Sequence, residues 1–160
     1  MDDSRRRLTD ARLRVPDRPM RFAGATGTRS LGLGRHASST LLLVHPDGCA
    51  DCRSFLLALA TRVREFSDWG GQVIVCVPSE DAGGIPRLLP SEVSVVLDPG
   101  GALEKALSAT APAALVADQW GEVHYLEMGG ADHRLPPPAE LTSWARYLAI
   151  RCPECEGEAL

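Results

Sequence analysis

The stretch "LLLVHPDGCADCRSFLLALATRVREF", residues 41–66, joins a strand pattern to a helix pattern through two cysteines. Residues 41–46 are an apolar run closed by a proline and glycine turn, which is typical of a buried strand. Farther on, apolar residues recur at spacings of three and four, which predicts one amphipathic helix that ends near "SDWGG", residues 67–71. These apolar residues are Phe55, Leu56, Leu59, Val63 and Phe66. Cys49 and Cys52 therefore lie at the turn between a strand and a helix.

The position of the two cysteines gives them a chemical role. Backbone N–H groups at a helix start are unpaired and carry partial positive charge, which stabilises a thiolate and lowers the pKa of the thiol. Cys52 lies about one turn after Cys49, close enough to attack a mixed disulfide formed there. The pattern predicts a dithiol–disulfide couple in which Cys49 attacks and Cys52 resolves. Asp51 places a negative charge between the thiols, so we expect it to raise their pKa somewhat.

Strand and helix patterns alternate along the rest of the chain. This alternation predicts a mostly parallel sheet covered on both faces, and the last two strands, joined by a "QWG" turn, add an antiparallel hairpin. The predicted strands are 72–78, 93–98, 113–118 and 122–128, and the predicted helices are 101–109 and 138–150. Residues 21–35 have the character of an irregular segment or a weak hairpin.

The length of 160 residues suits one domain, which we place at 21–150. An arginine-rich arm, 1–20, precedes it, as a solvated tail or a docking arm, and a cysteine-containing tail, 151–160, follows. The net charge of −4 gives no reason to expect a nucleic-acid partner, and no apolar run is long enough to predict a membrane span. Because the N-terminus lacks the apolar segment of a secretory signal, we expect a cytoplasmic protein, where closely spaced cysteines are more often catalytic or metal-binding than structural.

Residues 20–150 resemble the thioredoxin-like superfamily, and within it the redoxin branch that includes the alkyl hydroperoxide reductase/thiol-specific antioxidant family. "LLLVHPDGCADC" matches the strand and active-site turn, and "VLDPGGALEKALSATAPAALVADQWGEVHYLEMG" matches the later stretch of helix, proline, strand, D-x-x-G turn and strand. Pro112 matches the family's cis-proline, which faces the cysteine pair. The resemblance implies an α/β fold with a central mixed sheet flanked by helices on both faces, a substrate groove at Pro112, Ala111 and His45, and no required cofactor.

The chain also departs from the relatives it resembles. Thioredoxins usually carry an aromatic residue before the first cysteine and a proline inside the pair, whereas this chain has Gly48 and Ala50–Asp51. Peroxiredoxins carry a threonine three residues before the peroxidatic cysteine, where this chain has Pro46. The departures favour thiol–disulfide exchange with a disulfide-bearing protein or small molecule, supported by a thiol electron donor. The alternatives are a thiol peroxidase, with Cys49 oxidised to a sulfenic acid and resolved by Cys52, and a non-catalytic subunit that binds a partner or a metal.

Two further residues lie near the cysteine pair or in the next predicted strand. His45 follows the apolar run, and it either accepts a proton from Cys49 and tunes it or is a polar cap at the end of a strand. Cys76 lies inside the apolar strand 72–78, which predicts a buried small hydrophobic side chain.

A second cysteine pair, Cys152 and Cys155, lies in the C-terminal "CPEC". The first interpretation is a second redox couple that relays electrons to Cys49 and Cys52 of the same or another chain. The second is half of a zinc site completed across a dimer or by a partner, because such a turn aims two sulfurs at one metal. The third is a tail without a role. In the fold that the chain resembles, the last helix runs away from the active-site end, so we expect Cys152 to start at the opposite pole.

Overall fold

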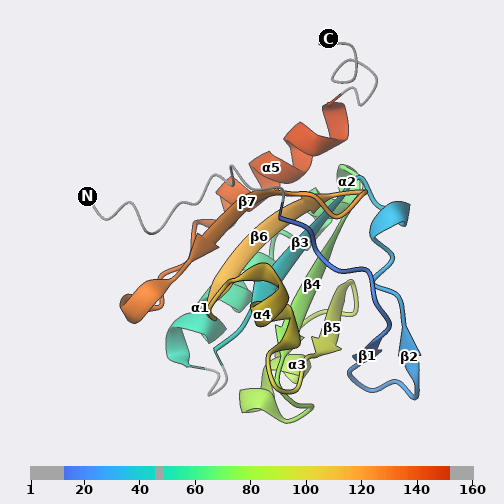
Figure 1. The fold of residues 1–160 in the computed structure, drawn as a ribbon. Helices are drawn as coiled ribbons and strands as arrows, with labels where there is room; N and C mark the ends of the chain where they lie inside the picture. The colour runs from blue at the N-terminus through green and yellow to red at the C-terminus, as the bar shows by residue number, and fades with distance from the viewer. Residues whose placement is uncertain (1–12, 46–48, 152–160) are drawn as a thin grey trace.

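The computed structural model describes residues 13–45 and 49–151, and within them one seven-stranded mixed sheet (Figure 1). The order of strands across the sheet is β2-β1-β5-β4-β3-β6-β7. The strands are β1 Met20–Phe22, β2 Thr28–Arg29, β3 Ser38–Leu43, β4 Gly71–Val77, β5 Val93–Leu97, β6 Ala113–Asp118 and β7 Val123–Met128. The α-helices are α1 Ala50–Ala60, α2 Val63–Asp68, α3 Ile85–Leu88, α4 Ala102–Leu107 and α5 Pro138–Ile150. Short 3₁₀ turns are η1 Leu33–Arg35, η2 Ala82–Gly84 and η3 Gly130–Asp132.

The centre of the sheet is parallel and its flanks are antiparallel. β3 pairs in parallel with β4, and β4 in parallel with β5, while β6 runs antiparallel to β3 and β7 antiparallel to β6. β3 has a strand on each side and is buried along its whole length, which explains why its sequence is a continuous apolar run. The predicted α/β class and mixed sheet are confirmed. The expectation of a mostly parallel sheet is wrong, because β1, β2, β6 and β7 all pair antiparallel with their neighbours.

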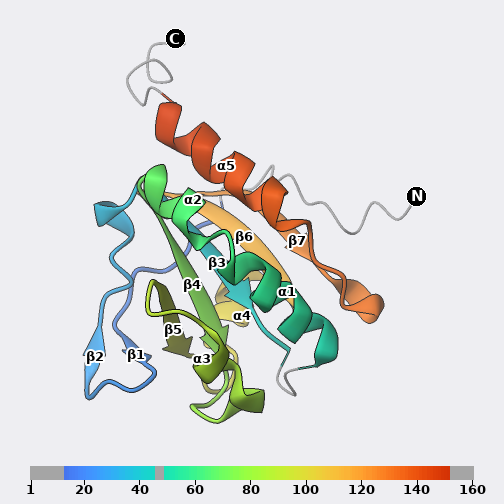
Figure 2. The ribbon, with the colours of Figure 1, turned by 180° about the vertical axis from the view of Figure 1, so that it is seen from behind.

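Two apolar cores lie on the two faces of the sheet. Leu42 belongs to the core under α1, α2 and α5, whereas its neighbours Leu41 and Leu43 belong to the core under α4, as the alternation of side chains along a strand requires. The two views show α1, α2 and α5 on one face and α4 on the other (Figures 1 and 2). Among the described residues, no helix has both the length and the apolar character that crossing a membrane requires.

The helix predicted as one element ending near residues 67–71 is two helices, α1 and α2. At the break, the Thr61 hydroxyl donates to the Ala58 carbonyl at 2.7 Å, a bond that competes with the regular helix pattern. Arg62 leaves the helical region with φ −114°, and its guanidinium donates two hydrogen bonds of 2.9 Å to Glu65. The apolar stripe continues across this break, since the apolar side chains before and after the break are buried in one core. Those side chains are Leu56, Leu59, Val63 and Phe66.

The N-terminal part of the described chain packs against the domain. Residues 13–20, which the sequence assigned to the arm, include the buried side chain of Val15. The Val15 N–H donates to the Gly121 carbonyl at 2.8 Å, and the Val123 N–H donates to the Leu13 carbonyl at 2.9 Å. Of the two alternatives for 21–35, a short antiparallel hairpin of β1 and β2 is what forms. Residues 1–12 of the predicted arm lie outside the described residues.

Candidate active site

Three connecting segments meet at one edge of the sheet. In the register of the sheet, Leu43 at the end of β3 pairs with Ala113 at the start of β6, and Ala113 pairs with Met128 at the end of β7. The segment after β3 carries His45 and Cys49, the segment before β6 carries Ala111 and Pro112, and the segment after β7 carries Gly129 to His133. Residues far apart in the chain are therefore brought together at this edge.

The two cysteines lie at the start of α1 with different exposure. Cys49 is the N-cap residue of α1 and is half-buried, whereas Cys52, in the first turn, is 1% exposed. Their sulfur atoms are 3.3 Å apart. A disulfide bond of about 2.05 Å needs only a small approach of the two sulfurs from this distance. Cys49, the outer thiol, is accessible to a substrate, whereas Cys52, the inner thiol, is placed to attack a mixed disulfide formed on Cys49.

The environment separates the acidities of the two thiols. Burial alone would raise the pKa of Cys49, but the backbone and thiol of Cys52 and the ring of His133 outweigh it, so that the net pKa lies below its ordinary value. For Cys52, burial is the largest effect, and the neighbouring charges of Cys49 and Asp51 add to it, so that its pKa is raised to about 11. The predicted effect of Asp51 is therefore found on Cys52 but not on Cys49, whose pKa is lowered, so that Cys49 is the thiol that ionises first.

His133 is the site residue that the sequence did not indicate. Its Nδ1 lies 3.2 Å from the Cys49 sulfur, although the two residues are 84 positions apart in the chain. His133 follows the turn η3 and has a φ of 53°, a left-handed conformation. The His45 ring stacks on the His133 ring with centroids 4.6 Å apart. The His45 backbone also hydrogen-bonds the Cys52 thiol, which opposes the rise in its pKa. The contact with the Cys49 sulfur that the sequence suggested for His45 is made by His133.

Pro112 is held at the same edge by a close contact with Gly129. The Ala111–Pro112 peptide bond is cis, as the resemblance implied, and the Gly129 N–H donates to the Pro112 carbonyl at 2.7 Å. A Cβ atom on Gly129 would lie 2.8 Å from Pro112 Cγ and 3.1 Å from backbone atoms of His133 and Arg134. Glycine at this position is what allows the proline and the His133 segment to approach each other.

Replacing Gly129 by alanine is therefore expected to damage the site more than the fold. The added methyl group must displace backbone on the His133 side, and overpacking of this kind costs about 1–3 kcal/mol of stability. We expect the contact between His133 and Cys49 to be disturbed, so that alkylation of Cys49 at neutral pH slows while the protein stays folded. Iodoacetamide kinetics and urea unfolding measure the two effects. The Gly34→Ala variant is the control, because an added Cβ there lies 4.0 Å from its nearest neighbour, the Gln119 carbonyl oxygen. Unchanged alkylation kinetics in Gly129→Ala would contradict this account.

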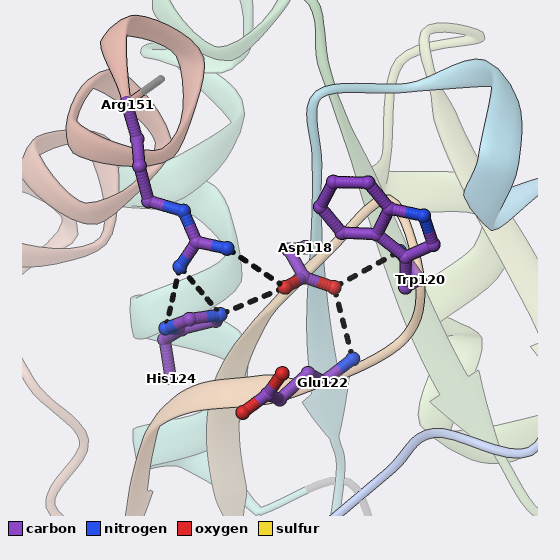
Figure 3. A network of polar contacts seen from close by, with 5 residues as sticks. All are labelled: Asp118, Trp120, Glu122, His124 and Arg151. Atoms are coloured by element: carbon purple, nitrogen blue, oxygen red, sulfur yellow. Dashed lines mark hydrogen bonds and ion pairs between the residues drawn. The ribbon is translucent and has the colours of Figure 1, made fainter. Parts of the chain in front are cut away.

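A second polar cluster lies at the opposite end of β6 (Figure 3). One oxygen of the buried Asp118 accepts from the Trp120 and Glu122 N–H groups at 2.9 and 3.0 Å, which closes the predicted turn after β6. Its other oxygen lies 2.9 Å from His124 Nε2 and 3.4 Å from the Arg151 guanidinium. The cluster ties the hairpin to the end of α5, and it lies far from the cysteines along β6.

The same cluster has the composition of a cation site. Ligand atoms of Asp118, Glu122 and His124 all lie within 4.8 Å of one another. The Arg151 guanidinium already brings positive charge to this point, since it also lies 3.1 Å from His124 Nε2. Hydrogen bonds and an ion pair therefore account for the arrangement. Cys152 and Cys155, for which the sequence suggested a zinc site or a redox couple, lie outside the described residues.

Cys76 lies apart from the active-site thiols. It is buried on the α4 face of β4 and lines a pocket of about 230 Å³ together with Asp98 and Glu104. Burial first, and then the charges of Asp98 and Glu104, raise the pKa of the Cys76 thiol far above its ordinary value. A thiol that stays protonated is a poor nucleophile. The burial of Cys76 agrees with the buried small side chain that the sequence predicted.

No protein-family model and no curated protein matches the chain, but solved structures do. A secreted thiol-disulfide isomerase from Corynebacterium glutamicum is 19% identical with a TM-score of 0.73, and the match covers 94% of this chain and 95% of that one. This chain has the thioredoxin-like fold. Mycobacterium bovis AhpC is 14% identical with a TM-score of 0.70, covering 92% and 97% of the two chains. Xanthomonas campestris peroxiredoxin Q is 14% identical with a TM-score of 0.68, covering 88% and 99%. These thioredoxin-like neighbours are redoxins, and at such identities they establish the fold alone.

Proposed function

We propose that the protein is a thiol–disulfide oxidoreductase that uses Cys49 and Cys52 as a redox couple. The observation that carries the proposal is the pair of sulfurs 3.3 Å apart at a helix start, with the pKa of the outer thiol lowered and that of the inner thiol raised. This asymmetry suits a nucleophile followed by a resolving thiol. Among the structures with a similar fold, one is named a thiol-disulfide isomerase and another a peroxiredoxin.

The reaction proceeds in two exchanges. The Cys49 thiolate attacks one sulfur of the substrate disulfide, so that a Cys49–substrate disulfide forms and the other substrate sulfur leaves and takes up a proton. Cys52 then attacks the Cys49 sulfur, the second substrate sulfur leaves, and the Cys49–Cys52 disulfide forms. Two electrons pass from the dithiol to the substrate, and the two thiol protons end on the two product thiols. A thiol electron donor returns the enzyme to the dithiol.

The Cys52→Ser variant tests this mechanism. Without the resolving thiol, the first exchange stops at the Cys49–substrate disulfide, so we expect the variant to accumulate a covalent adduct with reducible insulin or with a disulfide-bearing protein. The adduct is seen as a mass increase that dithiothreitol reverses. The Cys76→Ser variant is the matched control, because it removes a thiol outside the site and is expected to turn over normally. If Cys52→Ser captures nothing and the wild type reduces no model disulfide, the mechanism is wrong.

A thiol peroxidase is the second candidate function. Its support is the half-buried, easily ionised Cys49 together with the likeness to AhpC and peroxiredoxin Q. In that reaction the Cys49 thiolate attacks a peroxide oxygen, an alcohol or water leaves, and Cys52 converts the sulfenic acid to a disulfide with loss of water. Rapid loss of one equivalent of peroxide per reduced protein favours this function. Slow loss, at the rate of an ordinary thiol, leaves disulfide exchange as the activity.

We also propose a cytoplasmic location for the protein. A cytoplasmic location suits a reductant, because thiols stay reduced there. One thioredoxin-like neighbour is described as secreted, which makes an oxidising compartment the alternative. Alkylation of the native protein at the moment of cell lysis separates the two, since Cys49 and Cys52 are expected as free thiols in the first case and as a disulfide in the second.

A further inference from the structure

His133 is held against the Cys49 sulfur by its backbone and its ring. Its N–H donates to the Gly130 carbonyl at 3.2 Å, which closes the turn η3, and its φ of 53° turns the side chain out of that turn. The His45 ring stacks on it, and Nδ1 lies 3.2 Å from the Cys49 sulfur. At this distance a protonated ring donates a hydrogen bond to the thiolate, and a neutral ring can accept the thiol proton.

The charges around His133 come from three segments. Cys49 is the acidic group in contact with Nδ1, and His45 is the second titratable ring. The Arg134 side chain is 82% exposed and lies 4.0 Å from Asp132, so this ion pair is formed at the surface. Cys49 and His45 contact His133, and Asp132 and Arg134 are its neighbours in the chain. Cys52 contacts Cys49 on α1, and the charge of Asp51 acts on Cys52.

We propose that His133 is a catalytic acid–base residue, which holds the proton of the Cys49 thiol and passes it to the thiolate that leaves when Cys49 attacks a disulfide. This inference rests on the proposed function. In the reduced enzyme the proton lies on Nδ1 and Cys49 is a thiolate. When the Cys49–substrate disulfide forms, the leaving sulfur takes that proton and His133 becomes neutral. The thiolate charge disappears from Cys49 in the same step, so no net charge is left at the site.

The test uses variants that keep the backbone. Because His133 has a left-handed conformation, asparagine and glycine are the residues that replace it with least strain. His133→Asn keeps a polar group near the sulfur but cannot hold the proton, and His133→Gly removes the contact. Both are made in a Cys52→Ser background, so that Cys49 is the one cysteine in tryptic peptide 36–53 and the reaction stops after the first exchange. His36→Ala, which removes a histidine near the start of β3, is the control.

The first measurement is the pH profile of Cys49 alkylation by iodoacetamide, followed on that peptide. The rate rises with pH as the thiolate forms, and loss of His133 removes a group that favours the thiolate. We expect the inflection to move up by about one pH unit in His133→Gly, which corresponds to roughly tenfold slower alkylation below it, and not to move in His36→Ala. An inflection that is the same with and without His133 overturns the proposal. This measurement needs no disulfide substrate.

The second measurement compares two leaving groups. The aromatic thiolate released from 5,5′-dithiobis(2-nitrobenzoate) leaves without a proton, whereas the alkyl thiolate of oxidised glutathione has a higher pKa and benefits from one. After each rate is divided by the alkylation rate at the same pH, we expect His133→Asn to be roughly 10- to 100-fold slower with oxidised glutathione and nearly unchanged with the aromatic disulfide. Equal losses with both disulfides overturn the proton transfer. A parent chain that attacks neither disulfide overturns the proposed function and this transfer together, while the alkylation profile still decides where the Cys49 proton lies.

Discussion

Replacing Cys49 by serine is expected to lower the rate of disulfide reduction by roughly a thousandfold or more, because it removes the nucleophile. A serine hydroxyl at the same helix start stays protonated at neutral pH, and no other described thiol can take its place. Cys52 is buried with a pKa raised to about 11, and Cys76 is enclosed in the α4 face of the sheet. The insulin reduction assay with dithiothreitol as donor measures this loss.

The comparison with Cys52→Ser makes this prediction specific. That variant keeps the nucleophile, so it is expected to release the first thiol from a substrate and then stop, whereas Cys49→Ser releases none. Substitution of Cys76 is expected to change the rate by less than about twofold, because the side chain lies outside the site. Activity of Cys49→Ser within tenfold of the wild type would show that another group carries the reaction.

Replacing Phe66 by alanine is expected to cost about 3–5 kcal/mol of unfolding free energy. Phe66 is 1% exposed and lies in α2, which packs on β4 and α5, so its removal leaves a cavity where three elements meet. Urea unfolding followed by circular dichroism measures the change.

Leu57 provides the matched control for this prediction. It lies on the outer face of α1 with 49% of its surface exposed, so Leu57→Ala is expected to change the unfolding free energy by about 0.5 kcal/mol or less. A loss below about 1 kcal/mol in Phe66→Ala would mean that α2 is not part of the cooperative core.

The sequence predicted those parts of the fold that local patterns determine. β6 is apolar up to its last residue, Asp118, and lies between Pro112 and the turn that follows Asp118, so its limits were predicted correctly. The break between α1 and α2 was missed, since the apolar stripe continues across it and the side-chain bonds of Thr61 and Arg62 leave no trace in hydrophobic periodicity.

The candidate site, too, was predicted only in those parts that a local sequence pattern determines. Cys49 and Cys52 are three residues apart, and the strand and helix on either side indicate where they lie. His133 is brought to Cys49 by the pairing of β7 with β6 and of β6 with β3, and a single histidine in a loop carries no spacing signal. A left-handed residue after a turn that ends a strand is visible only in the structure. The roles of Cys152 and Cys155 stay predictions, which metal analysis and a thiol count on native protein can test.

The central claim is that Cys49 and Cys52 form a reversible dithiol–disulfide couple, and a redox titration tests it most directly. The variant with Cys76, Cys152 and Cys155 replaced by serine is equilibrated in glutathione buffers of graded ratio, alkylated under denaturing conditions and weighed by mass spectrometry. The account predicts one two-electron transition, between a form alkylated at both cysteines and a form alkylated at neither. Two cysteines that remain alkylated at every ratio, or that become glutathionylated without forming a disulfide with each other, would contradict it.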